Sequence, residues 1–145
     1  MRVLLVGSGG REHALAVSLA RTAEVLAAPG NPGIAEVARC VPVDVTDIEG
    51  LVALARREAV DLVVPGPEAP LVAGLADACA VAGIPCAGPS REAARLEASK
   101  SFAREVAEEA GIPGPVTTRR FPEVTHTLRT QPGPPSLGRY RQGGR

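Results

Sequence analysis

Short strand-forming segments alternate with helix-forming segments along most of this sequence, and this alternation limits the fold more than any other feature. The strand predictions rest on short apolar runs at residues 2–6, 24–29, 41–45, 61–66 and 84–88. Helix-forming segments lie at residues 11–21, after Thr46, at about 69–82, after Ser90 and at about 99–110. Such alternation produces right-handed βαβ crossovers and a parallel sheet. The predicted fold class is therefore α/β, with a Rossmann-like parallel sheet flanked by helices.

Local signals set the ends of two of these helices. Thr46 is a candidate N-cap, and Glu49 three residues later would complete a capping box. The helix after Thr46 would then bury one face, formed by Ile48, Leu51, Val52 and Ala55. Gly83 is predicted to end the helix at about 69–82 because glycine adopts the left-handed conformation that helix ends favour.

Composition supports a layered fold and excludes several classes of function. The chain has 145 residues, of which 45% are hydrophobic and only 2% aromatic, so the core must be built from Val, Leu, Ile and Ala. Sixteen basic residues balance sixteen acidic ones, so bulk charge gives no indication of a nucleic-acid partner. We find no signal peptide and no apolar run long enough to cross a membrane.

The three cysteines indicate a reducing compartment. Cys40, Cys79 and Cys86 form no CxxC pair, so free, buried thiols are expected rather than a metal or redox site. The expected location is therefore the cytoplasm.

Glycine- and proline-rich loops follow four of the predicted strands. Their sequences are GSGGREH (7–13), APGNPG (28–33), PGPEAPL (65–71) and AGPS (87–90). Parallel α/β sheets bind ligands at the carboxyl ends of their strands, where these loops would meet. The alternative is that these residues serve only as turns between strands and helices.

The first loop is typical of an anion site. Gly7, Gly9 and Gly10 allow close approach of the backbone to a ligand, the following helix directs free N–H groups toward it, and Arg11 adds a fixed positive charge. A dinucleotide is disfavoured because Glu12 occupies the position of the third glycine of G-x-G-x-x-G.

The second loop disfavours a dinucleotide as well, because the segment AAPGN lacks the acidic residue that would bind a ribose. A sugar phosphate fits the loops better, with Glu12, Asn31 and Glu68 as candidate partners of its hydroxyl groups.

A longer set of motifs resembles one enzyme family. In order and spacing, GSGGREHALA, AAPGNPG, VDVTD, DLVVPGPEAPLVAGLAD and GPSREAARLEASKSFA resemble the N-terminal part of phosphoribosylamine–glycine ligases, also called glycinamide ribonucleotide synthetases. The resemblance covers about residues 1–113. It implies an ATP-grasp enzyme of purine biosynthesis that joins glycine to 5-phosphoribosylamine through an acyl phosphate. ATP and Mg²⁺ or Mn²⁺ would be its cofactors.

The resemblance also implies a domain organisation and a set of site residues. Residues 1–88 would form the substrate-binding domain and residues 89–128 the start of the ATP-grasp domain. Residues 129–145 are expected to be a disordered tail because of their Gly-, Pro- and Arg-rich composition. Lys100 would bind an ATP phosphate. The residues expected to bind 5-phosphoribosylamine are Gly9, Gly10, Arg11, Glu12, Asn31, Pro67 and Glu68.

Each of these residues also has a purely structural interpretation. Arg11 and Glu12 could form a charged first helical turn, Glu68 could cap the helix after it, and Lys100 could lie on a solvated helix face. His13 is expected to be structural, and no function is expected for His126. No catalytic residue and no metal ligand is predicted within this chain.

The chain departs from the family after about residue 113. The family continues for several hundred residues with its glycine, metal and adenine sites, whereas this sequence ends in SLGRYRQGGR. Read one nucleotide later, codons for residues 138–145 can encode a segment close to the family's phosphate-binding loop, so a frameshifted or truncated ligase is the preferred interpretation. We therefore expect the chain alone to be inactive and to bind no cofactor tightly.

Two other functions fit the same loops. The chain could be a non-catalytic sugar-phosphate or nucleotide-binding module, or a fragment of an NAD(P)-linked enzyme.

Overall fold

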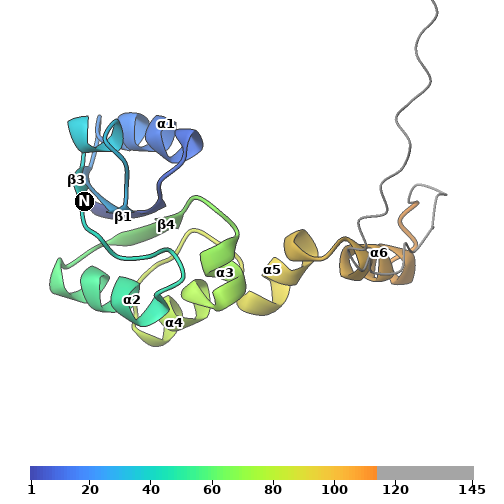
Figure 1. Ribbon diagram of the computed structural model, residues 1–145. Helices are drawn as coiled ribbons and strands as arrows, with labels where there is room; N and C mark the ends of the chain where they lie inside the picture. The colour runs from blue at the N-terminus through green and yellow to red at the C-terminus, as the bar shows by residue number, and fades with distance from the viewer. Residues whose placement is uncertain (114–145) are drawn as a thin grey trace, which may run out of the picture. The chain divides into compact units, whose positions relative to one another are not determined.

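A computed structural model describes residues 1–113 and shows one parallel sheet of four strands (Figure 1). The strands are β1 (Arg2–Gly7), β2 (Glu24–Pro29), β3 (Arg39–Cys40) and β4 (Leu62–Pro65), in the spatial order β3-β2-β1-β4. All three pairings are parallel. The predicted fold class is confirmed.

Helices cover both faces of the sheet (Figure 1). One face carries α1 (Gly10–Leu19) and the short 3₁₀ helix η1 (Ile34–Glu36), and the other carries α2 (Ile48–Arg57) and α4 (Leu75–Val81). The strands are short and apolar on both faces, as buried parallel strands are.

Alternate residues of the strands point to opposite faces of the sheet and pack into two separate hydrophobic cores. Leu4 pairs with Leu26 and Val63, and these three side chains pack with those of α2 and α4. Leu5 faces the other way, toward Ala16 of α1 and Ile34 of η1. Burying each leucine side chain contributes about 1.5–3 kcal/mol. Both cores therefore depend on β1, which supplies residues to each.

The third strand is shorter and earlier than predicted. The expected strand at 41–45 is wrong, because only Arg39 and Cys40 pair with β2. Val41 still donates its N–H to the Ala27 carbonyl at 2.8 Å, but Pro42 has no N–H with which to continue the ladder. The chain then turns, and the Val43 N–H bonds to the Val41 carbonyl at 2.8 Å.

The predicted fifth strand is reduced to a single bridge between Val63 and Cys86. Val63 donates to the Pro85 carbonyl at 2.9 Å and accepts from Ala87 at 2.8 Å. Pairing stops there because the Gly88 N–H bonds back to the Cys86 carbonyl at 3.1 Å, which turns the chain away.

The helix predicted at about 69–82 is two helices, α3 (Ala69–Ala73) and α4, separated by Gly74. Gly74 has φ +101, a left-handed conformation that breaks the helix, and the Arg91 guanidinium bonds to the Ala73 carbonyl freed there. The predicted end at Gly83 is confirmed, because its φ is +72 and the next N–H, of Ile84, bonds to the Cys79 carbonyl at 2.9 Å.

The cap of α2 is Asp47 rather than the predicted Thr46. An Asp47 carboxylate oxygen accepts the Gly50 N–H at 2.9 Å. Thr46 is not available as a cap because its hydroxyl bonds to Asp44 at 2.5 Å. This hydrogen bond also lowers the pKa of the Asp44 carboxyl.

Two further helices, α5 (Arg91–Ala98) and α6 (Lys100–Glu109), follow the sheet. Ser90 caps α5, as predicted, and Ser99 caps α6. Helix α5 packs against α3 and α4, and α6 packs against α5, where the Arg95 guanidinium lies 4.0 Å from the centre of the Phe102 ring. None of the helices within residues 1–113 is long and apolar enough to span a membrane.

Several predictions fall outside the described residues or stay untested. The interpretations of the tail and of His126 lie outside residues 1–113, and the boundaries at 88 and 128 stay predictions. All three cysteines are free; Cys79 is buried, whereas Cys40 and Cys86 are only half-buried.

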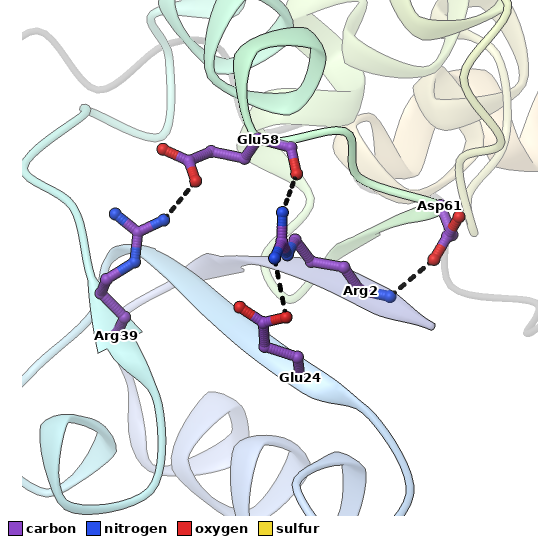
Figure 2. Close-up of polar contacts among 5 residues, drawn as sticks. All are labelled: Arg2, Glu24, Arg39, Glu58 and Asp61. Atoms are coloured by element: carbon purple, nitrogen blue, oxygen red, sulfur yellow. Dashed lines mark hydrogen bonds and ion pairs between the residues drawn. The ribbon is translucent and has the colours of Figure 1, made fainter.

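An ion-pair cluster joins the amino ends of three strands to the end of α2 (Figure 2). The Arg2 guanidinium donates to Glu24 at 2.9 Å and to the Glu58 carbonyl, while the Arg2 N–H bonds to Asp61 at 2.6 Å. Arg39 pairs with the Glu58 carboxylate, and this contact holds the pKa of Glu58 below its usual value.

The lowered pKa of Glu58 predicts a pH-dependent contribution to stability. Because the folded state favours the ionised carboxylate, the contribution is complete above the unfolded pKa of about 4.3 and is lost as pH falls through the lower folded value. Glu58→Gln should therefore melt below the wild type at pH 7, and the difference should shrink below about pH 4. Thermal melts across pH, with Glu36→Gln as the control, test this; a constant difference at every pH would contradict it.

Candidate functional site

Three of the four loops lie together at the carboxyl edge of the sheet. In the sheet register Gly7 pairs with Pro29, and Val6 pairs with Pro65, so β1, β2 and β4 end side by side. Side-chain hydrogen bonds connect the loops that follow. Asn31 Nδ2 donates to the Ser8 carbonyl at 2.7 Å, and the Arg11 guanidinium donates to the Gly66 carbonyl. The prediction that GSGGREH and GPEAPL share one edge is therefore confirmed.

Glu12 is the buried charge of this edge, with only 5% of its surface exposed. One of its carboxylate oxygens accepts the Gly9 N–H at 2.6 Å, and the other accepts from Arg11 Nε at 3.2 Å. It lies in the first turn of α1, where the helix dipole favours a negative charge. These contacts offset the cost of burying a carboxylate.

Arg11 is the exposed cation of this edge, with 64% of its side chain exposed. Its guanidinium is held between two loops by Glu12 and by the Gly66 carbonyl. Its Nη1 group has no partner among residues 1–113. The side chain therefore stays available to an anion while its position is fixed.

The start of α1 supplies backbone donors beside Arg11. Gly9 is the N-cap and Gly10 the first helical residue, and the first hydrogen bond within the helix runs from the His13 N–H to the Gly9 carbonyl at 3.0 Å. The N–H groups of the first helical turn therefore lack helical partners. A methyl carbon added at Gly10 would meet nothing within 4 Å, so the backbone there is open to approach.

Asn31 connects the second loop to the first. Besides its bond to Ser8, its side-chain oxygen accepts the Ile34 N–H at 2.8 Å. His13 has a packing role, as expected, because a methyl carbon at Gly33 would lie only 2.8 Å from its Cε1.

Pro67 and Glu68 follow β4. Pro67 is half-buried near Gly7, where a methyl carbon would lie 3.1 Å from its Cδ. Glu68 is at the N-cap position of α3, but its exposed carboxylate makes no capping hydrogen bond. Because that carboxylate has no ion pair or hydrogen bond within residues 1–113, it is available to a ligand.

Within residues 1–113, no hydrogen bond or ion pair connects Lys100 to the loops at this edge. Lys100 is the exposed first residue of α6. The fourth loop contacts the third, because Gly88 packs against Leu71, the last residue of PGPEAPL. No group of three or more His, Cys, Asp and Glu side chains within residues 1–113 is arranged to hold a metal ion.

Two residues of the edge were not predicted as site residues. Gly66 accepts from Arg11 and lies against the Glu12 side chain, and Ser8 accepts from Asn31. The sequence signal that could have indicated Gly66 was its position directly after a strand. Its contact with Glu12 joins residues 54 positions apart, so no local sequence pattern could have indicated that contact.

Comparison with known proteins identifies the family. The model of the phosphoribosylglycinamide synthetase N domain matches residues 1–97, which is more than half of the chain. The chain belongs to this family. A phosphoribosylamine–glycine ligase from Streptomyces coelicolor is 58% identical over 116 residues, which cover 78% of this chain and 28% of the relative. The chain therefore spans little more than a quarter of that relative's length.

A solved structure of a phosphoribosylamine–glycine ligase and one of a biotin carboxylase domain have the same fold as this chain. The crystal structure of phosphoribosylamine–glycine ligase from Thermotoga maritima matches 77% of this chain and 25% of its own, with 28% identity and a TM-score of 0.58. The biotin carboxylase domain of a single-chain bacterial carboxylase matches 77% of this chain and 29% of its own, with 27% identity and the same TM-score of 0.58. The N-domain family thus shares its architecture with carboxylases.

Proposed function

We propose that this chain is the N-terminal part of a phosphoribosylamine–glycine ligase and that its carboxyl sheet edge binds the phosphorylated sugar 5-phosphoribosylamine. The observation that supports this most is the exposed Arg11 guanidinium, held by two loops beside the free N–H groups at the start of α1. A helix N-terminus with an adjacent arginine is suited to a phosphate group. Membership of the phosphoribosylglycinamide synthetase N-domain family supports 5-phosphoribosylamine as that sugar phosphate.

The proposed roles follow from the hydrogen-bond donors and acceptors that each residue leaves unpaired. Arg11 and the N–H groups of Gly10 and its neighbours bind the phosphate. Glu68 offers an unpaired carboxylate to a sugar hydroxyl or to the amine. Asn31 and Pro67 shape the loops beside them, and Gly9 directs its N–H to Glu12 instead of the ligand.

The proposed reaction of the full-length enzyme joins glycine to the sugar amine with ATP. ATP supplies the phosphoryl group that activates the glycine carboxylate. Lys100, an exposed lysine at the start of a helix, is suited to bind an ATP phosphate oxygen as a point charge. Residues 1–113 do not fit a divalent metal, because no group of three His, Cys, Asp or Glu side chains that could hold one forms among them.

A non-catalytic sugar-phosphate module is the second candidate, because Arg11 and the start of α1, which are proposed to bind the phosphate, both lie within residues 1–113. Under both proposals the 145-residue protein binds a sugar phosphate without turnover. With ATP, glycine and 5-phosphoribosylamine it should release no ADP above background, whereas a full-length relative should do so. Release of ADP that depends on this chain would show that it carries the reaction itself.

The phosphate role of Arg11 predicts a specific loss of binding. Arg11→Ala should weaken the binding of ribose 5-phosphate by about 1.5–3 kcal/mol, or roughly 10- to 150-fold in Kd, because a charge-assisted hydrogen bond is lost. Arg21→Ala is the matched control, since Arg21 is exposed and follows α1 at its other end.

Calorimetry on both variants, with thermal melts to establish that they are folded, measures this difference. NAD should bind the wild type more weakly than ribose 5-phosphate does. Unchanged affinity in a folded Arg11→Ala protein would contradict the proposed site.

A further inference from the structure

Three glycines at the carboxyl edge of the sheet lie against one side chain, that of Glu12. A methyl carbon added at Gly66 would lie 2.3 Å from Glu12 Cγ, and one at Gly9 would lie 2.6 Å from Glu12 Oε2. At Gly7 the distance to Glu12 Cγ would be 2.5 Å. All three distances are shorter than any carbon can approach without a shift of the neighbouring atoms.

Backbone conformation does not explain two of these glycines. Gly9 has φ −85, which any residue adopts, and Gly66 is not among the glycines with positive φ. Only Gly7, at φ +137, needs glycine for its conformation. The space that the Glu12 stem occupies therefore explains Gly66, whereas at Gly9 the added carbon would meet only the carboxylate oxygen that the Gly9 N–H binds.

The contacts of Glu12 extend over two loops and the start of α1. Its carboxylate bonds to the Gly9 N–H and to Arg11, and its stem lies against Gly66, whose carbonyl in turn binds Arg11. Each Glu12 oxygen accepts a hydrogen bond within the protein, and only 5% of the residue is exposed, so little of the carboxylate surface is left for a ligand. Glu68 differs, because its exposed carboxylate has no hydrogen bond or ion pair within residues 1–113.

We propose that Glu12 is a positioning residue: its buried carboxylate joins the loops after β1 and β4 and holds Arg11 where the phosphate of the ligand binds. The joining of the loops is independent of any ligand. The effect on the phosphate rests on the function proposed above. On this proposal, position 66 carries glycine because the Glu12 side chain leaves no room for a larger residue, and not because the ligand approaches there.

A double-mutant cycle on the ligand-free protein tests the contact with Gly66. Gly66→Ala should lower the Tm by about 4 °C or more in the wild type, because the added methyl group collides with the Glu12 stem. In a Glu12→Ala background Gly66→Ala should cause little further loss, because the three atoms nearest the added carbon are Glu12 Cγ, Oε1 and Cδ, which alanine lacks. Gly10→Ala is the control, since a methyl group there meets nothing within 4 Å and should leave the Tm unchanged or raised.

An equal effect of Gly66→Ala in both backgrounds would overturn the proposed contact. If Glu12→Ala does not fold in buffer, both arms of the cycle are melted in sucrose, which stabilises the folded state without restoring the Glu12 side chain. An equal effect of Gly66→Ala in both backgrounds under that condition would overturn the proposal.

A second cycle separates positioning from a purely structural role. Glu12→Gln, whose side chain has a similar size but cannot pair as an anion with Arg11, should raise the Kd for ribose 5-phosphate about fivefold or more in the folded protein. In an Arg11→Ala background it should raise the Kd no further, because Glu12 acts through Arg11. Additive losses would mean that Glu12 contacts the ligand itself, and an unchanged Kd would mean a structural role only; either overturns the proposal.

The two cycles fail in different ways. If the wild type does not bind ribose 5-phosphate, the proposed function fails, while the melts of the first cycle still decide whether Glu12 and Gly66 are coupled.

Discussion

The burial of β1 is the constraint on which the rest of this structure depends. Val3, Leu4, Leu5 and Val6 have no exposed surface, and the strand is paired on both sides. A strand that is buried on both faces needs helices above and below it, and its parallel neighbours need crossover connections. Its end at Gly7 then fixes where the first loop and the start of α1 lie. The position of this carboxyl edge is therefore set by packing before any ligand binds.

At that edge, the burial of one charged side chain, Glu12, fixes the position of another, Arg11. Glu12 costs free energy to bury, and that cost is offset by a backbone N–H, by Arg11 and by the helix dipole. In return the exposed Arg11 is held by two contacts, so less side-chain freedom remains to be lost when an anion binds. Asn31 makes the corresponding connection on the other side, to the loop after β2. The edge is thus built as one connected set of loops.

The sequence predicted the elements whose signals are local. β1, β2, β4 and the caps at Ser90 and Gly83 follow from apolar runs and capping residues, and all appear in the structure. The third strand was predicted at 41–45 although Pro42, which lacks a ladder donor, is visible in the sequence; only Arg39 and Cys40 pair with β2. The break at Gly74 was missed, and the Arg91 guanidinium that binds the Ala73 carbonyl there comes from 18 residues further along the chain. At the site, the shared edge was predictable from parallel topology, whereas the burial of Glu12 against Gly66 was not, since only the folded chain brings them together. Which residues touch the ligand stays a prediction.

The central claim is that the carboxyl edge of the sheet binds a phosphorylated sugar. Titration of ¹⁵N-labelled protein with ribose 5-phosphate, followed by amide chemical shifts, tests it most directly. The account predicts saturable shifts at Gly10, Arg11 and Glu12, with the amides of Ala23 and Ala59 at the opposite edge unchanged. Ribose without phosphate should produce much smaller shifts, because the phosphate contacts are absent. Shifts confined to the opposite edge, or none at millimolar ligand, would contradict the account.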